Sequence, residues 1–241
     1  QTSICTIILR CWHNFFPATE IIIINFLFSP ANMGLKRSNN TLKSFYLIRL
    51  RDCIVLSHTL PSEKLASYQI PVIAIEREAE HISSVNTDNY MGALQATSLL
   101  IRDKCDILIH INVNVKKSVP AYDRIRAFKE TCEEHHVPYH IDLSVEGNTY
   151  QEILNVIRVI FDKIEAKYPD QKGIFLANDT YANMFLNLIF QKYGTFPSTY
   201  EIVGFDDSPI ASEAILPITT VGQQIDVIVQ NRHGSSGPAD G

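Results

Sequence analysis

Gly173-Ile-Phe-Leu-Ala-Asn-Asp179 and Glu201-Ile-Val-Gly-Phe-Asp-Asp207 are two short apolar runs that each end in amide or acidic side chains. A buried parallel strand shows this pattern when its carboxyl end opens into a polar crevice. Between the two runs, apolar residues recur at helical spacing from Thr180 to Tyr193. The stretch therefore predicts a β-α-β unit whose two polar strand ends lie side by side.

The polar side chains at these strand ends are candidates for ligand contacts, because open α/β sheets bind small molecules beyond the carboxyl ends of their strands. The candidates are Asn178, Asp179, Asp206 and Asp207. Asn and Asp also favour helix caps and turns, so a purely structural role is an equal alternative. The spacing alone does not separate these two interpretations.

Strand-like and helix-like patterns alternate along most of the chain. Apolar runs at residues 3–9, 52–57, 70–75, 106–112 and 139–143 predict strands, and periodic segments at 90–101, 120–134 and 149–168 predict helices. We also expect a helix from residue 16 or 17 to 28, a short helix at 42–50 and a helical turn at 61–65. The alternation predicts an α/β fold with parallel sheets and helices on both sheet faces.

The composition is that of a globular protein, with 46% hydrophobic and 20% charged residues among 241. A net charge of -5 and only isolated basic pairs argue against a nucleic-acid surface on this chain. Five cysteines without CxxC spacing predict reduced, buried thiols and no metal site. The apolar run at 21–28 is too short to span a bilayer and no signal peptide is apparent, so we expect a cytoplasmic protein without membrane contact.

Six motifs in a fixed order give the sequence a family resemblance. They are Ile70-Pro-Val-Ile-Ala-Ile-Glu-Arg77, Val85-Asn-Thr-Asp-Asn-Tyr-Met-Gly92, Arg124-Ile-Arg-Ala-Phe128, Leu176-Ala-Asn-Asp179, Ile202-Val-Gly-Phe-Asp-Asp207 and Ile218-Thr-Thr-Val-Gly-Gln223. This order resembles the effector-binding core of LacI/GalR transcriptional regulators. The resemblance covers roughly residues 50–225, and Gly-Phe-Asp-Asp followed by Thr-Thr-Val-x-Gln is its most specific part.

The resemblance implies a fold like that of periplasmic sugar-binding proteins, with two similar lobes and a ligand cleft between them. Each lobe is a parallel sheet flanked by helices. We expect residues 1–101 to form the N-terminal lobe, 102–222 the C-terminal lobe, and 223–230 a segment returning toward the first lobe. Residues 231–241 are rich in Gly and Ser and are expected to form a disordered tail.

The resemblance also implies a set of ligand-binding residues. Phe15 and Phe16 resemble the aromatic pair after the first strand, although His13-Asn14 stands where the family usually has Asn-Pro, and Glu76 stands where it usually has Asp. Arg124, Asn178 and Asp206 resemble the cleft arginine, asparagine and aspartate. The full expected set is Phe15, Phe16, Glu76, Asp88, Ser118, Arg124, Asn178, Asp206 and Gln223. Asp88 is also well placed to cap the helix that follows it, and the residues favour that structural role.

These residue types suit a sugar and need no catalytic group, metal or cofactor. Arg presents a fork of donors, carboxylates accept from vicinal hydroxyls, and aromatic rings cover the apolar face of a sugar. The resemblance therefore implies a sugar-sensing effector domain, working as a homodimer. No DNA-binding helix-turn-helix is recognised in the sequence, so operator DNA would be contacted only through an N-terminal domain outside it.

Two other functions remain open from the residues. One is a periplasmic or surface sugar-binding protein of a transport system, which shares the implied fold. The other is a hydrolase that uses Asp179 or Asp206 with His110 or His140. The absence of a nucleophile elbow, a P-loop and a metal-spaced His pair disfavours an enzyme.

Overall fold

The computed structural model describes residues 22–24, 53–55, 62–67, 72–76 and 80–223. The chain divides into two compact units, which we call unit 1 (Gln1–Asn86 with Ile228–Gly241) and unit 2 (Thr87–Val227). The strand predicted at 3–9, the helix at 42–50, the pair Phe15 and Phe16, and the tail at 231–241 lie outside the described residues.

Unit 1 contains a parallel sheet with the strand order β1-β2-β3-β4. Its described elements are β1 (Ile22–Ile24), β2 (Cys53–Val55), α3 (Ser62–Ala66), β3 (Val72–Ile75) and β4 (Ser83–Val85). The predicted strands at 52–57 and 70–75 and the helical turn at 61–65 are confirmed. The short strand β4 was not predicted.

The helix predicted through the isoleucines near residue 22 is wrong, because Ile22–Ile24 forms strand β1 and pairs in parallel with β2. Four consecutive isoleucines occupy positions 21–24. Side chains branched at Cβ lose rotamer freedom in a helix and fit a pleated sheet better. An uninterrupted apolar run also has no helical period. Pro17 was therefore the only signal for a helix start, and it was a weak one.

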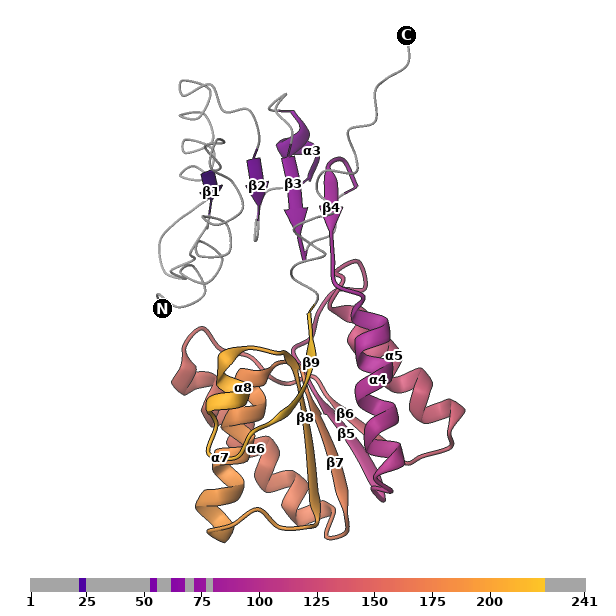
Figure 1. Ribbon diagram of the computed structural model, residues 1–241, viewed down its shortest axis with the longest axis vertical. Coiled ribbons are helices and arrows are strands. Elements are labelled where there is room, and N and C mark those ends of the chain that lie inside the picture. Colours follow the sequence, from indigo (N-terminus) through magenta and orange to yellow (C-terminus); the bar gives the residue numbers. More distant parts are fainter. Residues whose placement is uncertain (1–21, 25–52, 56–61, 68–71, 77–79, 224–241) are drawn as a thin grey trace. The chain divides into compact units, whose positions relative to one another are not determined.

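Unit 2 is a second parallel sheet, with the strand order β6-β5-β7-β8-β9. Its strands are β5 (Ile107–Ile111), β6 (Tyr139–Asp142), β7 (Lys172–Leu176), β8 (Tyr200–Asp206) and β9 (Thr219–Gly222). Its helices are α4 (Asn89–Arg102), α5 (Tyr122–Glu134), α6 (Tyr150–Lys167), α7 (Asp179–Tyr193) and α8 (Pro209–Glu213). Figure 1 shows α4 and α5 on one face of this sheet and α6, α7 and α8 on the other.

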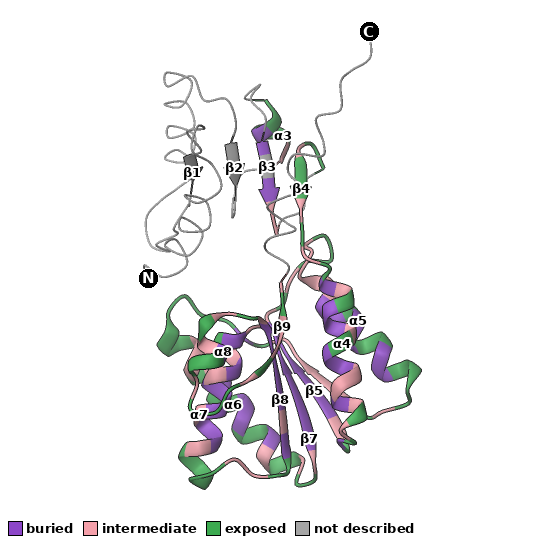
Figure 2. Ribbon diagram, viewed as in Figure 1, coloured by how far each residue is buried: buried purple, intermediate pink, exposed green. Residues whose placement is uncertain are grey.

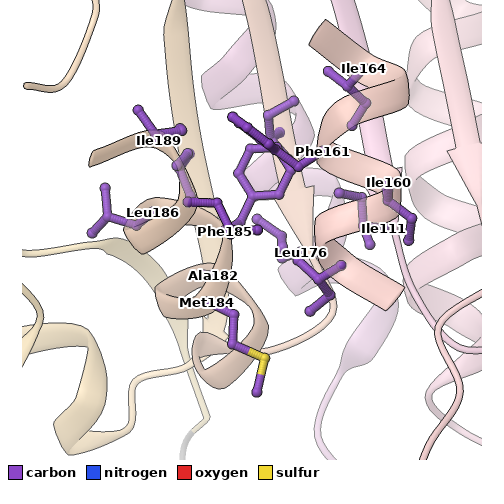
Figure 3. Packing of buried hydrophobic residues seen from close by; sticks show 14 of the residues in the cluster. Ile111, Ile160, Phe161, Ile164, Leu176, Ala182, Met184, Phe185, Leu186 and Ile189 are labelled. Carbon is purple, nitrogen blue, oxygen red and sulfur yellow. The ribbon is translucent and has the colours of Figure 1, made fainter. Parts of the chain in front are cut away.

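Side chains along the central strands point alternately to the two sheet faces and pack into two separate cores, one on each face. Ile174 and Leu176 of β7 pack with α6 and α7, whereas Phe175 packs with α4 and α5. Figure 2 shows the central strands β5, β7 and β8 buried and the outer helix faces exposed. In Figure 3, Phe161 of α6 faces Phe185 of α7, and their ring centroids are 5.3 Å apart. The predicted arrangement of a parallel sheet between two helical layers is confirmed.

The boundary between the units lies between Asn86 and Thr87, whereas the sequence placed it after residue 101. The reason is the packing of α4, whose small inner face lies against the second sheet. Ala93, Ala96 and Leu100 of this helix share a core with residues of β5, β7 and β8, namely Leu108, Phe175, Val203 and Phe205. The helix therefore folds with the strands that follow it.

Candidate functional site

The carboxyl ends of β7 and β8 bring together the polar side chains that the sequence singled out. Asp206 ends β8, and Ala177 and Asn178 follow β7. Arg124 reaches the same edge from the first turn of α5, and Gln223 follows β9. Parallel pairing of β7, β8 and β9 places these ends at one edge of the sheet, where α/β folds bind their ligands.

Arg124 is the centre of this group and is only 9% exposed. Its Nε donates to Asn89 Oδ1 at 2.7 Å, and its Nη1 donates to the carbonyl oxygen of Ala177 at 2.5 Å. Its Nη2 lies 3.6 Å from Asp206 Oδ1, and its guanidinium carbon lies 3.7 Å from the centre of the Phe205 ring. We call Asn89, Arg124, Ala177, Phe205 and Asp206 the Arg124 cluster. Polar contacts at its edges and the Phe205 ring against one face thus hold the guanidinium in place.

Asp206 is the solvent-facing member of the cluster, with a side chain that is 35% exposed. Its Oδ1 also accepts a hydrogen bond from Gln223 Nε2 at 2.7 Å. The backbone of Asp206 has φ 108° and that of Asp207 has φ 49°. Residues other than glycine adopt such angles at a cost, and strain of this kind gathers at ligand sites. The strained turn presents the carboxylate at the end of β8.

Asp179 has a structural role beneath this edge, although the sequence left it open as a ligand contact. It is 1% exposed, and its Oδ2 accepts hydrogen bonds from the backbone N and the Oγ of Ser208, at 2.7 and 3.0 Å. Its Oδ1 accepts from Thr220 Oγ1 at 2.5 Å. The carboxylate therefore joins the start of α7 to the turn after β8 and to β9.

The structure brings together three of the predicted ligand-binding residues directly, namely Arg124, Asp206 and Gln223. Asn178 is next to Ala177, and its Oδ1 caps α7 by accepting from the backbone N of Tyr181 at 2.9 Å. The helix-capping alternative that the sequence left open for Asn178 is therefore confirmed.

The remaining members of the predicted set are Asp88, Ser118, Glu76, Phe15 and Phe16. Asp88 is exposed and caps α4, since its Oδ1 accepts from the backbone N of Met91 at 2.9 Å. Ser118 is exposed in a turn between β5 and α5. Glu76 belongs to unit 1, where it follows β3 with φ 54°. Phe15 and Phe16 are not among the described residues.

The cluster contains a residue that the sequence reasoning missed, Asn89. A usable signal was present, because Asn89 precedes Ala93, Ala96 and Leu100 at helical spacing and so belongs to the inner face of α4. Asp88, one residue earlier, lies outside that stripe. The inner position explains why Asn89 and not Asp88 contacts Arg124.

His110 is a buried core residue, which removes it as a base for the hydrolase alternative. Its Nδ1 is 2.9 Å from the carbonyl oxygen of Phe175, so this nitrogen carries the proton and donates. Its Nε2 then accepts from Asn112 Nδ2 at 3.0 Å. Burial lowers the pKa of His110 to about 4, and the nearby Arg124 charge also lowers it. Both ring nitrogens are therefore engaged in a neutral, structural histidine.

The buried His110 makes the stability of unit 2 depend on pH. The unfolded chain takes up a proton near pH 6.5, whereas the folded histidine resists it down to about pH 4. Its contribution is fully present above pH 6.5 and is lost as the pH falls toward 4. We expect the wild type to lose roughly 3 kcal/mol more than His110→Gln over this window. Urea denaturation across this pH range measures the difference, and equal losses in both proteins would contradict it.

A cavity of about 340 Å³ lies elsewhere in unit 2, over α6 and α7. Its lining is mostly apolar and comprises Tyr150, Leu154, Met184, Asn187, Leu188, Phe190, Gln191 and Ile215. None of the predicted ligand-binding residues lines it. Polar groups converge at the Arg124 cluster instead, which is therefore the better candidate for a polar ligand.

Comparison with known proteins decides the family. The sequence model of the periplasmic binding protein-like domain family matches residues 99–231 of this chain. This chain belongs to the periplasmic binding protein-like family. The match covers most of unit 2, including the ends of β7, β8 and β9 where the Arg124 cluster lies.

The relatives of this periplasmic binding protein-like chain include sugar-operon repressors. The ribose operon repressor of Halalkalibacterium halodurans is 30% identical over 180 residues, covering 71% of this chain and 50% of the repressor. The sucrose operon repressor of Streptococcus mutans is 28% identical over 170 residues, covering 70% of this chain and 50% of the repressor. The chain thus spans about half the length of the curated relatives it matches.

A solved structure of a LacI family regulator from Lactobacillus casei with bound sucrose has the same fold. It matches with a TM-score of 0.67 and 17% identity, covering 86% of this chain and 79% of the regulator. The resemblance of the six sequence motifs to the LacI/GalR effector-binding core is confirmed at the level of family and fold. In the part of the chain that the structure describes, no helix has the length and apolar character needed to cross a membrane.

Proposed function

We propose that this chain is the sugar-sensing part of a LacI/GalR-type transcriptional regulator. The observation that carries the proposal is the Arg124 cluster at the carboxyl edge of the second sheet, with Asn178 and Gln223 beside it. A guanidinium fork, a carboxylate and amides together offer donors and acceptors that match vicinal hydroxyl groups. The curated relatives are operon repressors for ribose and sucrose, which supports a regulator over a transport protein.

The chemistry of the cluster suits a neutral polyol in particular. Arg124 already faces Asp206 across 3.6 Å, so the cation and the anion balance within the site. A sugar hydroxyl placed beside this pair accepts from the guanidinium and donates to the carboxylate at the same time. Glu76, Asp88, Ser118 and the aromatic pair Phe15 and Phe16 remain proposed ligand contacts from the family resemblance.

Regulation follows if the sugar has different affinity for two conformations of the full-length protein. A ligand shifts such an equilibrium only by its differential binding free energy, typically about 1–3 kcal/mol. We infer that the regulator is a cytoplasmic homodimer, because two-fold operators are bound by paired recognition helices. Operator DNA would be bound through a DNA-binding domain outside residues 1–241.

A thermal-shift screen of the purified chain tests the proposed function. The panel contains D-ribose and other pentoses, hexoses, sucrose, cellobiose, phosphosugars and nucleosides. A ligand at a hundred times its Kd stabilises the folded state by about 2.7 kcal/mol, which raises the melting temperature of a chain this size by roughly 5–10 °C. We expect such a rise with one class of sugar.

The enantiomer of each active sugar is the control, because it changes the solvent equally but has the wrong stereochemistry for the site. A flat response from a well-folded chain across the whole panel would argue against sugar sensing. Chromatography of the incubated sugar separates sensing from catalysis, since turnover would favour the hydrolase alternative.

A further inference from the structure

Asn89 uses both ends of its side-chain amide within the fold. Its Oδ1 accepts from Arg124 Nε at 2.7 Å, and its Nδ2 donates to the carbonyl oxygen of Thr87 at 3.1 Å. Its backbone N donates to the same carbonyl at 2.8 Å. The residue is 2% exposed. Asn89 thus joins Thr87, the first residue of unit 2, to the arginine of the candidate site.

The contact at Nε helps to set the direction in which the rest of the guanidinium points. The group is planar, so a hydrogen bond at Nε limits rotation of the plane about the Cδ–Nε bond. The separation of Nη2 from Asp206 is 3.6 Å, which is too long for a direct hydrogen bond and does not fix this rotation by itself. The hydrogen bond from Nη1 to the Ala177 carbonyl at 2.5 Å also holds the plane, so Asn89 and Ala177 together supply an orientation that the ion pair leaves open.

The same helix also supports the aromatic floor of the cluster. Gly92 lies one turn after Asn89, and a Cβ added there would come within 2.8 Å of the Phe205 ring. The glycine lets α4 approach the ring over which the Arg124 guanidinium lies at 3.7 Å. The first turn of α4 thus contacts the arginine directly and supports the ring beneath it.

We propose that Asn89 is a positioning residue of the effector site. It orients the Arg124 guanidinium so that Nη2 faces Asp206 and the hydroxyl groups of a bound sugar. The ligand-dependent part of this inference rests on the proposed function. The orientation of the Arg124 side chain by Asn89 is testable without any sugar.

The first test observes the Nε–H signal of Arg124 by ¹H–¹⁵N NMR of the full chain at mildly acidic pH. The signal is assigned by its loss in Arg124→Lys. We expect slow solvent exchange in the wild type and fast exchange in Asn89→Ala. Asn89→Asp keeps an acceptor for Nε while losing the donor to Thr87, so it should restore slow exchange. A slowly exchanging Nε–H in Asn89→Ala would overturn the proposal.

Thr97→Val is the matched control for general damage to α4. Thr97 is fully buried in the same helix, and its Oγ1 donates to the carbonyl oxygen of Ala93 at 2.7 Å. We expect this variant to lower stability while leaving the Arg124 Nε–H signal slow. Fast exchange in Thr97→Val as well would overturn a specific role for Asn89. If Asn89→Ala does not fold, Asn89→Leu, which has nearly the same shape but no acceptor for Nε, replaces it, and slow exchange in that variant would overturn the proposal.

The second test measures affinity for the panel sugar that stabilises the wild type most. We expect Asn89→Ala to weaken binding roughly tenfold, and to cause no further loss in the Arg124→Lys background, which lacks an Nε donor. Equal losses in both backgrounds would overturn the proposal. If no panel sugar binds the wild type, the proposed function fails and the NMR result alone decides the role of Asn89.

Discussion

Arg124→Ala is expected to weaken sugar binding by at least about a hundredfold, or roughly 2.7 kcal/mol. The substitution removes the donors that now serve Asn89 and the Ala177 carbonyl, and it removes the cation that faces Asp206. A hydrogen bond to a charged group contributes about 1.5–3 kcal/mol, more than one between neutral groups. A ligand at this site would accept such hydrogen bonds from the same guanidinium. Isothermal titration with the sugar chosen by the screen measures the loss.

Arg126→Ala is the matched control for this experiment. Arg126 lies on the same helix but is exposed, with Nη2 3.0 Å from Asp123 Oδ1 and Nη1 3.9 Å from Glu130 Oε2. Surface ion pairs of this kind contribute little, so we expect unchanged sugar affinity. A folded Arg124→Ala variant with wild-type affinity would show that the ligand site lies elsewhere.

Gly204→Ala is expected to lower the stability of unit 2 by roughly 3 kcal/mol. A Cβ at this position would lie 2.3 Å from Asp179 Oδ1, a distance that no side-chain packing allows. Either β8 or the start of α7 must shift, which weakens the hydrogen bonds that Asp179 accepts from Ser208 and Thr220. For a chain of this size the melting temperature should fall by about 6–12 °C.

Gly222→Ala is the control for this loss. Gly222 lies on the adjacent strand β9, and a Cβ there would meet its nearest neighbour, Asp207 Cβ, at an ordinary 3.6 Å. We expect a change below about 1 kcal/mol, measured by urea denaturation of both variants. If the two substitutions proved equally harmful, the close approach of Gly204 to Asp179 would not be the cause.

The fold of unit 2 was predictable because its helices are long and periodic and its central strands are continuous apolar runs. In α6, the buried residues Ile157, Ile160 and Ile164 recur at helical spacing. The observed boundary between Asn86 and Thr87 was harder to predict, since nothing in the sequence of α4 itself says which sheet the helix covers. The isoleucines of β1 were misread because a run without polar interruptions carries no period.

The candidate site was predictable at the level of strand ends but not of individual hydrogen bonds. Asp206 ends one buried strand and Asp179 comes soon after another, yet Asp206 faces solvent beside Arg124 and Asp179 is buried under Ser208 and Thr220. Their difference depends on partners distant in sequence, which spacing does not reveal. Periodicity did carry the information that separates Asn89 from Asp88.

Hydrogen–deuterium exchange of the wild-type chain with and without the selected sugar tests the central claim most directly. Binding at the Arg124 cluster should slow exchange in the segments that form it, residues 87–92, 122–128, 177–181 and 205–208. Amides near a bound ligand open less often, so within unit 2 the protection should be confined to this edge. Protection at the cavity over α6 and α7, with none at these segments, would contradict the account.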